Sequence, residues 1–169
     1  MRRQWEVDFD RLSKELPERF QKNLKRVRDH LPRVFDLPFV VTHDDLNESN
    51  IMVDETGRIT GIVDWAEAKI LPFGISLWAL EGILGWMDRE GWHYHDNAAG
   101  LRAEFWRVFE AEVCGGGMEE QTKENIRMAR MVGMFLRHAF KGDDGPNGRA
   151  VADTDFALRY ANPLCTGDI

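Results

Sequence analysis

The sequence predicts a single α+β domain that spans residues 1–169 and is mostly helical, with one small β-hairpin. Its 169 residues are enough for one hydrophobic core. The apolar fraction is 43% and the charged fraction 30%, which is typical of a globular protein rather than a disordered one. Apolar residues recur at helical spacing before residue 32 and after residue 75, whereas short apolar runs with turn-forming residues occur between them.

The first predicted element is an amphipathic helix over residues 8–31. Pro17 divides it into two pieces and fits the first turn of the second piece, where a proline costs no hydrogen bond. Pro32 and Pro38 are expected to interrupt the chain in a short connection after the helix. Apolar residues in this stretch follow one another at a spacing of three or four: Phe9, Leu12, Leu16, Phe20, Leu24, Val27 and Leu31.

The middle of the chain predicts a strand, a polar loop and a hairpin. Residues 39–41 form a brief apolar run, after which polar residues dominate as far as Asn50. Two further apolar runs, residues 51–53 and 58–63, flank a DETG segment whose Asp and Gly favour a turn. Asn50 then precedes one strand and Asp64 follows its partner, so we expect both side chains at the same end of the hairpin.

From residue 75 onward the helical spacing returns. Glycines 115–117 are expected to end one of these helices, because glycine adopts backbone angles closed to other residues. Four helical segments are predicted, with a Gly- and Asp-rich loop over 141–153 before the last: residues 77–87, 101–109, 126–140 and 156–160.

Net charge and cysteine content indicate which kinds of partner and which cellular compartment to expect. A net charge of -7 and a pI near 5.3 argue against a nucleic-acid-binding surface, although a nucleotide bridged by magnesium is compatible with them. Cys114 and Cys165 lie too far apart for a metal-ligand motif, which suits a reducing cytosol. No signal peptide and no apolar run of about 20 residues is visible, so we expect a cytoplasmic protein without a membrane partner.

The strongest functional pattern is the segment THDDLNESN at residues 42–50, followed by Asp64. Phosphoryl transfer requires a base that orients the acceptor hydroxyl and oxygen ligands that hold magnesium on the phosphates. Asp45 suits the first task, and Asn50 and Asp64 suit the second. His43 is expected to hold the loop by hydrogen bonds.

These residues resemble a known family. The pattern HxDxxxxN at residues 43–50, followed by IVDW at 62–65, resembles the catalytic and metal-binding loops of the aminoglycoside phosphotransferase family, whose fold is similar to that of protein kinases. The similarity is greatest to its functionally undefined fungal members. It extends over about residues 8–160, with sharp motifs only between 42 and 74.

The resemblance implies ATP-dependent transfer of a phosphoryl group to a hydroxyl of a small molecule. Asp45 would be the base, assisted by His43, and Asn50 and Asp64 would hold Mg2+ for the ATP co-substrate. Met52 would lie under the adenine.

The departures from the family pattern concern charge and the nucleotide-binding half. Asp44 stands where the family often has a small residue, which adds a second negative charge beside the base. Residues 72–77 lack the acidic residue that often follows the metal-binding Asp. The 41 residues before Thr42 read as helix, without a glycine-rich loop or a strand-borne Lys, so we expect a kinase-like C-lobe alone, with the N-lobe absent. The exposed docking face would then allow self-association.

Alternatives from other classes stay open at this point. The chain is either an enzyme whose activity depends on a missing N-lobe or has been lost, or a non-catalytic kinase-like binding module, or a structural helical protein with a fortuitous loop. Several features have both a functional and a structural interpretation, the structural one being favoured: His93 and His95 as metal ligands, Trp86, Trp92 and Trp106 as a stacking platform, residues 115–117 as a phosphate cradle, and Asp88, Glu90, Asp143, Asp144 and Asp153 as a polycation site.

Overall fold

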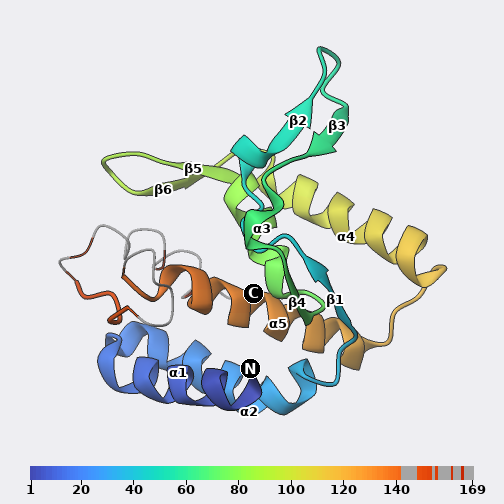
Figure 1. Cartoon of the computed structure of the whole chain (residues 1–169). Coiled ribbons are helices and arrows are strands. Elements are labelled where there is room, and N and C mark those ends of the chain that lie inside the picture. The colour runs from blue at the N-terminus through green and yellow to red at the C-terminus, as the bar shows by residue number, and fades with distance from the viewer. Residues whose placement is uncertain (142–147, 154, 156–160, 162–164, 166–169) are drawn as a thin grey trace.

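The fold is α+β and mostly helical, as predicted, and the part of the chain that the structure describes contains three two-stranded ribbons. The computed structural model describes residues 1–141, 148–153, 155, 161 and 165. The predicted final helix at 156–160 and much of the predicted loop at 141–153 therefore lie outside the described residues. Figure 1 shows helices α1, α2 and α5 as one layer, with the strands, α3 and α4 on the far side of α5.

The N-terminal segment forms two helices, α1 (Arg2–Glu15) and α2 (Gln21–Val34), with a 3-10 turn, η1 (Glu18–Phe20), between them. The predicted break is confirmed, although Pro17 stands before the 3-10 turn rather than in the first turn of α2. The expected place of Pro32 is wrong, because it lies in the last turn of α2. A proline removes one helical hydrogen bond and crowds the preceding turn. The helix accordingly ends soon afterwards.

The apolar stripe of α1 and α2 packs against α5 (Glu120–His138) and forms the main core. The phenyl rings of Phe9 and Phe135 meet edge to face, with ring centroids 6.0 Å apart. Every member of the predicted stripe is buried: Phe9, Leu12, Leu16, Phe20, Leu24, Val27 and Leu31. This layer supplies the rigid base on which the polar loop is mounted.

The predicted hairpin is confirmed as β2 (Ile51–Val53) and β3 (Ile59–Ile62), paired antiparallel. Its turn is closed by the Asp54 carboxylate, whose Oδ1 accepts hydrogen bonds from the backbone N–H groups of Thr56 and Arg58 at 2.9 and 3.0 Å. Gly57 adopts a φ of 82° in this turn, which a residue with a side chain rarely adopts. Figure 1 shows the hairpin extending away from the helical layer.

The first predicted strand, β1 (Phe39–Thr42), has a partner that the sequence pattern did not indicate. It pairs antiparallel with β4 (Lys69–Pro72), so that Thr42 lies opposite Lys69. Strand β4 has only four residues, and its partner β1 is distant along the chain. The periodicity of apolar residues cannot identify such a strand. The pairing closes the segment from 43 to 68 into a loop that contains the candidate site.

The predicted helix over 77–87 is wrong beyond Ile83. After a 3-10 turn, η4 (Ile75–Leu77), the helix α3 spans Trp78–Ile83, and β5 (Gly85–Met87) then pairs with β6 (Trp92–Tyr94). At Gly85 a Cβ atom would lie 2.4 Å from the carbonyl oxygen of His93. The close approach of the second strand therefore requires glycine here, and this tertiary contact outweighs the helical spacing of the apolar residues.

The C-terminal half contains the two long predicted helices. The helix α4 spans Ala98–Cys114 and ends at Gly115, whose φ of 65° confirms the role expected of the glycines. The helix α5 ends at His138, so Phe140 lies just beyond it, in an isolated bridge to Ala150. Within the described part of the chain, none of the helices has the length and apolarity needed to cross a membrane.

A buried charged cluster joins α3, α4, α5 and β6. The Glu81 carboxylate accepts hydrogen bonds from Arg130 at 2.7 Å and from Arg102 at 2.6 and 2.9 Å, and the Tyr94 hydroxyl donates to it at 3.3 Å. Burial opposes ionisation of Glu81, but the Arg102 hydrogen bond and the Arg130 charge outweigh it and lower its pKa. The cluster fixes the orientation of α3 and α4 against α5.

Candidate functional site

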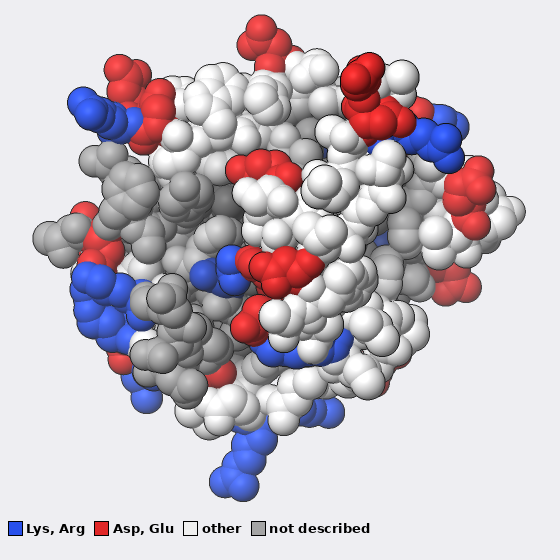
Figure 2. All heavy atoms as spheres, turned by 45° about the horizontal axis from the view of Figure 1, so that its top comes forward, with Lys and Arg blue, Asp and Glu red and all other residues white. Residues whose placement is uncertain are grey.

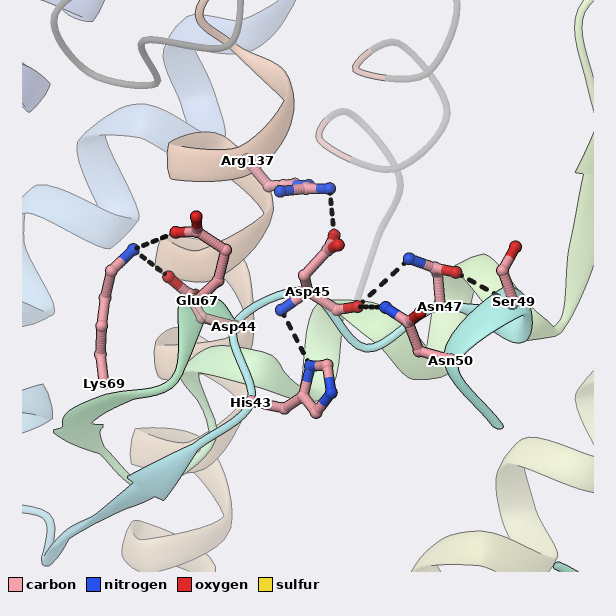
Figure 3. A network of polar contacts seen from close by, with 9 residues as sticks. All are labelled: His43, Asp44, Asp45, Asn47, Ser49, Asn50, Glu67, Lys69 and Arg137. Atoms are coloured by element: carbon pink, nitrogen blue, oxygen red, sulfur yellow. Dashed lines mark hydrogen bonds and ion pairs between the residues drawn. The ribbon is translucent and has the colours of Figure 1, made fainter. Parts of the chain in front are cut away.

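The polar loop between β1 and β2 is held by His43 (Figure 3). This buried imidazole donates a hydrogen bond from Nε2 to the carbonyl oxygen of Val63 at 2.8 Å. Its Nδ1 accepts one from the backbone N–H of Asp45 at 3.4 Å. Together the two bonds assign a neutral ring with its hydrogen on Nε2. His43 thus ties the loop to the residue that precedes Asp64.

Asp45 lies at the centre of the loop. Its carbonyl oxygen accepts hydrogen bonds from the side-chain amides of Asn50 at 2.8 Å and Asn47 at 3.2 Å. Its carboxylate is a quarter exposed and forms an ion pair with Arg137, which reaches it from the last turn of α5 (Figure 3). The backbone of Asp45 is therefore fixed while its carboxylate stays accessible.

Asn50 and Asp64 lie at the base of the hairpin, as the sequence predicted. Asn50 immediately precedes β2, and its carbonyl oxygen accepts a hydrogen bond from the N–H of Val63 at 3.0 Å. Because the Asn50 amide nitrogen donates to Asp45, its side-chain oxygen is left for another ligand. The Asp64 carboxylate is exposed and, among the described residues, binds no partner.

Two aspartates of this region adopt left-handed backbone angles. Asp44 has a φ of 60° and Asp64 a φ of 61°. Such angles are uncommon for residues other than glycine, although aspartate tolerates them better than most. They turn the chain sharply just before Asp45 and just after β3. Strained backbone of this kind is concentrated at functional sites.

Lys69 compensates the additional negative charge beside Asp45. Its ammonium group lies 2.7 Å from the Asp44 carboxylate and 3.6 Å from that of Glu67. The hydrogen bond that Lys69 donates to the Asp44 carboxylate raises the pKa of Lys69. Sequence reasoning missed this pair, because the two residues are brought together only by the pairing of β1 with β4. The extra carboxylate at Asp44 is thus neutralised within the fold.

Met52, expected under the adenine, lies on the hairpin outside the hydrogen-bonded loop. It is half exposed and stands opposite Gly61 on β3. A Cβ atom added at Gly61 would meet nothing within 4 Å, so the surface around this pair is open. The thioether of Met52 is accordingly accessible to a flat apolar ligand.

The donor atoms at Asn50 and Asp64 suit magnesium. Magnesium prefers oxygen ligands and usually binds through one or two carboxylates and the phosphates of a nucleotide. An amide oxygen and an unpaired carboxylate at the base of one hairpin fit that requirement. Within the described part of the chain, no group of three or more His, Cys, Asp or Glu side chains forms a metal site made by the protein alone.

The two histidines considered as metal ligands have other contacts. His93 bonds the Asp88 carboxylate at 2.9 Å and stacks on Trp86, with ring centroids 5.4 Å apart. His95 lies against the same indole, at 5.1 Å. His93 and Tyr94 belong to strand β6. The structural interpretation of these residues therefore agrees with their contacts.

The comparison with protein families identifies the segment that contains the loop. Residues 2–80 match a family model described as "Phosphotransferase enzyme family". Over these residues, just under half of the chain, the sequence is similar to that family. The resemblance inferred from the sequence motifs is thereby confirmed at the level of the family. The matched segment includes His43, Asp45, Asn50 and Asp64, whereas Arg137 lies outside it.

Two curated proteins are similar to parts of this chain. The uncharacterized protein YcbJ of Bacillus subtilis (strain 168) is 28% identical over 96 residues, which cover 52% of this chain and 31% of YcbJ. The Clavilactone A biosynthesis cluster protein Y of Ampulloclitocybe clavipes is 52% identical over 33 residues, 20% of this chain and 8% of that protein. The chain thus spans a third or less of either relative. No solved structure matches it.

Proposed function

We propose that this chain is the kinase-like C-lobe of a phosphotransferase, which transfers a phosphoryl group from ATP to a hydroxyl of a small molecule in the presence of magnesium. The observation that carries the proposal is the hydrogen-bonded loop in which His43, Asp45 and Asn50 are joined to the base of the β2–β3 hairpin. The family of residues 2–80 supports it independently. The nucleotide-binding N-lobe would be supplied by other residues, because α1, η1 and α2 occupy the segment before β1.

Each residue has a distinct part in the proposed reaction. The Asp45 carboxylate orients the acceptor hydroxyl and takes its proton as the oxygen attacks. His43 keeps the Asp45 backbone in place through its ring nitrogens. Asn50 and Asp64 hold magnesium, which neutralises charge on the phosphates when it is bound. Met52 offers an apolar surface to the adenine.

Replacement of Asp45 tests the enzymatic proposal. The variant Asp45→Asn is expected to lower the rate of MgATP-dependent phosphorylation of small alcohols by about 100-fold, the contribution of a general base. The measurement is ATP consumption, with a panel of acceptor alcohols, by the chain together with the N-lobe that this proposal requires. Asp36→Asn, a change at an exposed carboxylate outside the loop, is the matched control. Equal rates for wild type and Asp45→Asn would overturn the proposal.

A second candidate is a non-catalytic kinase-like module that binds a partner. One observation favours it, namely the exposed apolar side chains on the hairpin and the segment after it, which we call the hairpin surface: Met52, Val53, Ile59, Ile62, Val63 and Trp65. Exposed apolar patches of this kind mark interaction sites. Tight binding of MgATP by a strictly monomeric chain would count against this candidate.

The proposed setting is the cytoplasm, with a small-molecule acceptor and without a nucleic-acid or membrane partner. The net charge of -7 supports the lack of a nucleic-acid partner. Figure 2 supports it too, since acidic and basic side chains are interspersed on the face it shows and no continuous basic stripe is seen there.

A further inference from the structure

Arg137 is the described residue that reaches the carboxylate of Asp45. It lies in the last turn of α5, and its Nη2 donates to Asp45 Oδ1. A guanidinium group carries five N–H donors. Its remaining donors bind no described residue, and the side chain is 44% exposed. With respect to the described residues, one edge of the guanidinium is therefore open beside the candidate base.

The guanidinium of Arg137 is also held in place. It lies over the indole of Trp78, 5.1 Å from the ring centroid, and this indole is buried at the start of α3. The imidazole of His138 meets the same indole edge to face, at 5.8 Å. An arginine stacked on a buried aromatic ring and paired at one edge presents its other edge in a fixed direction, so little entropy is lost when a ligand binds there.

We propose that Arg137 selects an acceptor that carries a carboxylate close to its hydroxyl, which makes the acceptor a small hydroxy acid. This inference rests on the proposed phosphotransferase function. In the step, the hydroxyl proton passes to Asp45, the hydroxyl oxygen forms a bond to the γ-phosphorus of ATP, and the bond from that phosphorus to ADP breaks. A hydroxyl that reaches Asp45 lies next to the open edge of Arg137. That edge can bind a carboxylate through two parallel hydrogen bonds.

The charges around the loop favour an acid over an amine. The overall charge of -7 would attract a cation, but Asp44 is paired with Lys69 and Asp45 with Arg137. An ammonium group at this position would face the guanidinium and be repelled. The dianionic phosphate of a phosphorylated acceptor would meet greater repulsion from the nearby aspartates than a carboxylate would. A singly charged acid therefore fits best.

Of the acidic residues considered for a polycation, Asp143 and Asp144 lie outside the described residues, and Asp88 is engaged within the fold. The Asp88 carboxylate accepts hydrogen bonds from the backbone N–H groups of Glu90 and Gly91 at 2.7 and 3.1 Å, and it also bonds His93. Asp88 therefore closes the β5–β6 turn. Figure 2 shows basic groups directly beside acidic ones near the centre of the face it presents. This mixed surface does not favour a polycationic acceptor.

A matched panel of ligands tests the inference on the whole chain. The panel is 3-hydroxypropionate, 1,3-propanediol and 3-aminopropanol, which share one carbon chain and differ in the charge of one end. Binding is measured by calorimetry or NMR titration at pH 7, with wild type, Arg137→Gln, Arg137→Lys and the control Arg107→Gln, which removes an exposed arginine of α4. Wild type is expected to bind the acid at least about tenfold more tightly than the diol, and the amine more weakly than the diol.

The variants separate this inference from the proposed function. Arg137→Gln should abolish the preference for the acid, Arg137→Lys should retain part of it, and Arg107→Gln should leave it unchanged. A preference that survives Arg137→Gln, or no preference in wild type, would overturn the inference. Binding is measured without ATP and does not depend on phosphoryl transfer. An Arg137-dependent preference together with equal ATP consumption by wild type and Asp45→Asn would therefore overturn the proposed function alone. Phosphorylation of the diol in preference to the acid would overturn the inference alone.

Discussion

At the scale of single residues, the site is built by side chains that fix the backbone of Asp45 and leave its carboxylate accessible. His43, Asn47 and Asn50 bind its N–H and carbonyl groups, whereas Arg137 and solvent share its carboxylate. A base that is held by its main chain needs little reorganisation when an acceptor arrives. The same region contains a second titratable group, His138, whose contacts make the fold sensitive to acid.

Burial and the neighbouring Arg137 charge lower the pKa of His138 from 6.5 to about 4. Protonation is then easier in the unfolded chain than in the folded one. The contribution of neutral His138 to the free energy of unfolding is therefore fully present above pH 6.5. It is lost as the pH falls towards 4, by up to about 3 kcal/mol.

Chemical denaturation at pH values from 7 to 4 measures this effect. In His138→Phe, which keeps an aromatic ring against Trp78, the stability should depend less on pH in this window than in wild type. An NMR titration of the wild-type imidazole provides the control. If His138 in the folded protein titrated near 6.5, the predicted contribution would be absent.

At the scale of elements, the position of α3 depends on how closely η4 and α3 approach α5. Gly133 of α5 makes this approach feasible, since a Cβ atom there would lie 1.9 Å from the carbonyl oxygen of Ile75. The same contact brings Trp78 under Arg137 and so determines where the guanidinium stands. A glycine inside a helix costs about 1 kcal/mol relative to alanine, which close packing here offsets.

Gly133→Ala is expected to destabilise the chain by about 2 kcal/mol or more, because the gain in helix propensity is outweighed by the clash with η4. Gly100→Ala in α4 is the matched control, since a Cβ at Gly100 would meet nothing within 4 Å. It should be neutral or stabilising by up to about 1 kcal/mol. Urea denaturation measures both changes, and equal effects of the two substitutions would contradict the packing argument.

At the scale of the whole molecule, the helical layer is well covered, whereas the strands carry much exposed apolar area. Besides the hairpin surface, Phe39, Val41 and Ile70 of the β1–β4 ribbon are exposed, and Val41 lies directly opposite Ile70. Exposed strands with apolar side chains tend to associate. Both the hairpin surface and the β1–β4 ribbon thus carry exposed apolar side chains, and the proposed partner-binding role concerns the hairpin surface.

Self-association of the chain through the hairpin surface is the expected result in sedimentation velocity, with a fraction of dimer that rises with concentration. Ile59→Lys, which places a charge on β3, should weaken the association by about tenfold or more. Ile70→Lys on the β1–β4 ribbon is the matched control and should leave it unchanged. If Ile70→Lys weakened association and Ile59→Lys did not, the contact would belong to the other ribbon.

Local sequence patterns were sufficient to predict much of the fold. Helical spacing identified the buried stripe of α1 and α2, and the turn residues Asp54 and Gly57 identified the β2–β3 hairpin. The pairing of β1 with β4 and the β5–β6 hairpin were missed, because both depend on contacts rather than on periodicity. The loop residues from His43 to Asn50 were found together because their spacing in the chain is itself the motif.

The sequence by itself determined the class of the fold, the similarity of residues 2–80 to a phosphotransferase family and the loop on which the proposed chemistry depends. All three are encoded in residues near one another in the chain. Only the tertiary structure decided which charges face that loop. It brings Lys69 to Asp44 across a strand pair, and it brings Arg137 to Asp45 from a helix 92 residues later. Such pairs arise from packing of distant segments, which no local pattern records, and they determine the charge that an acceptor would meet.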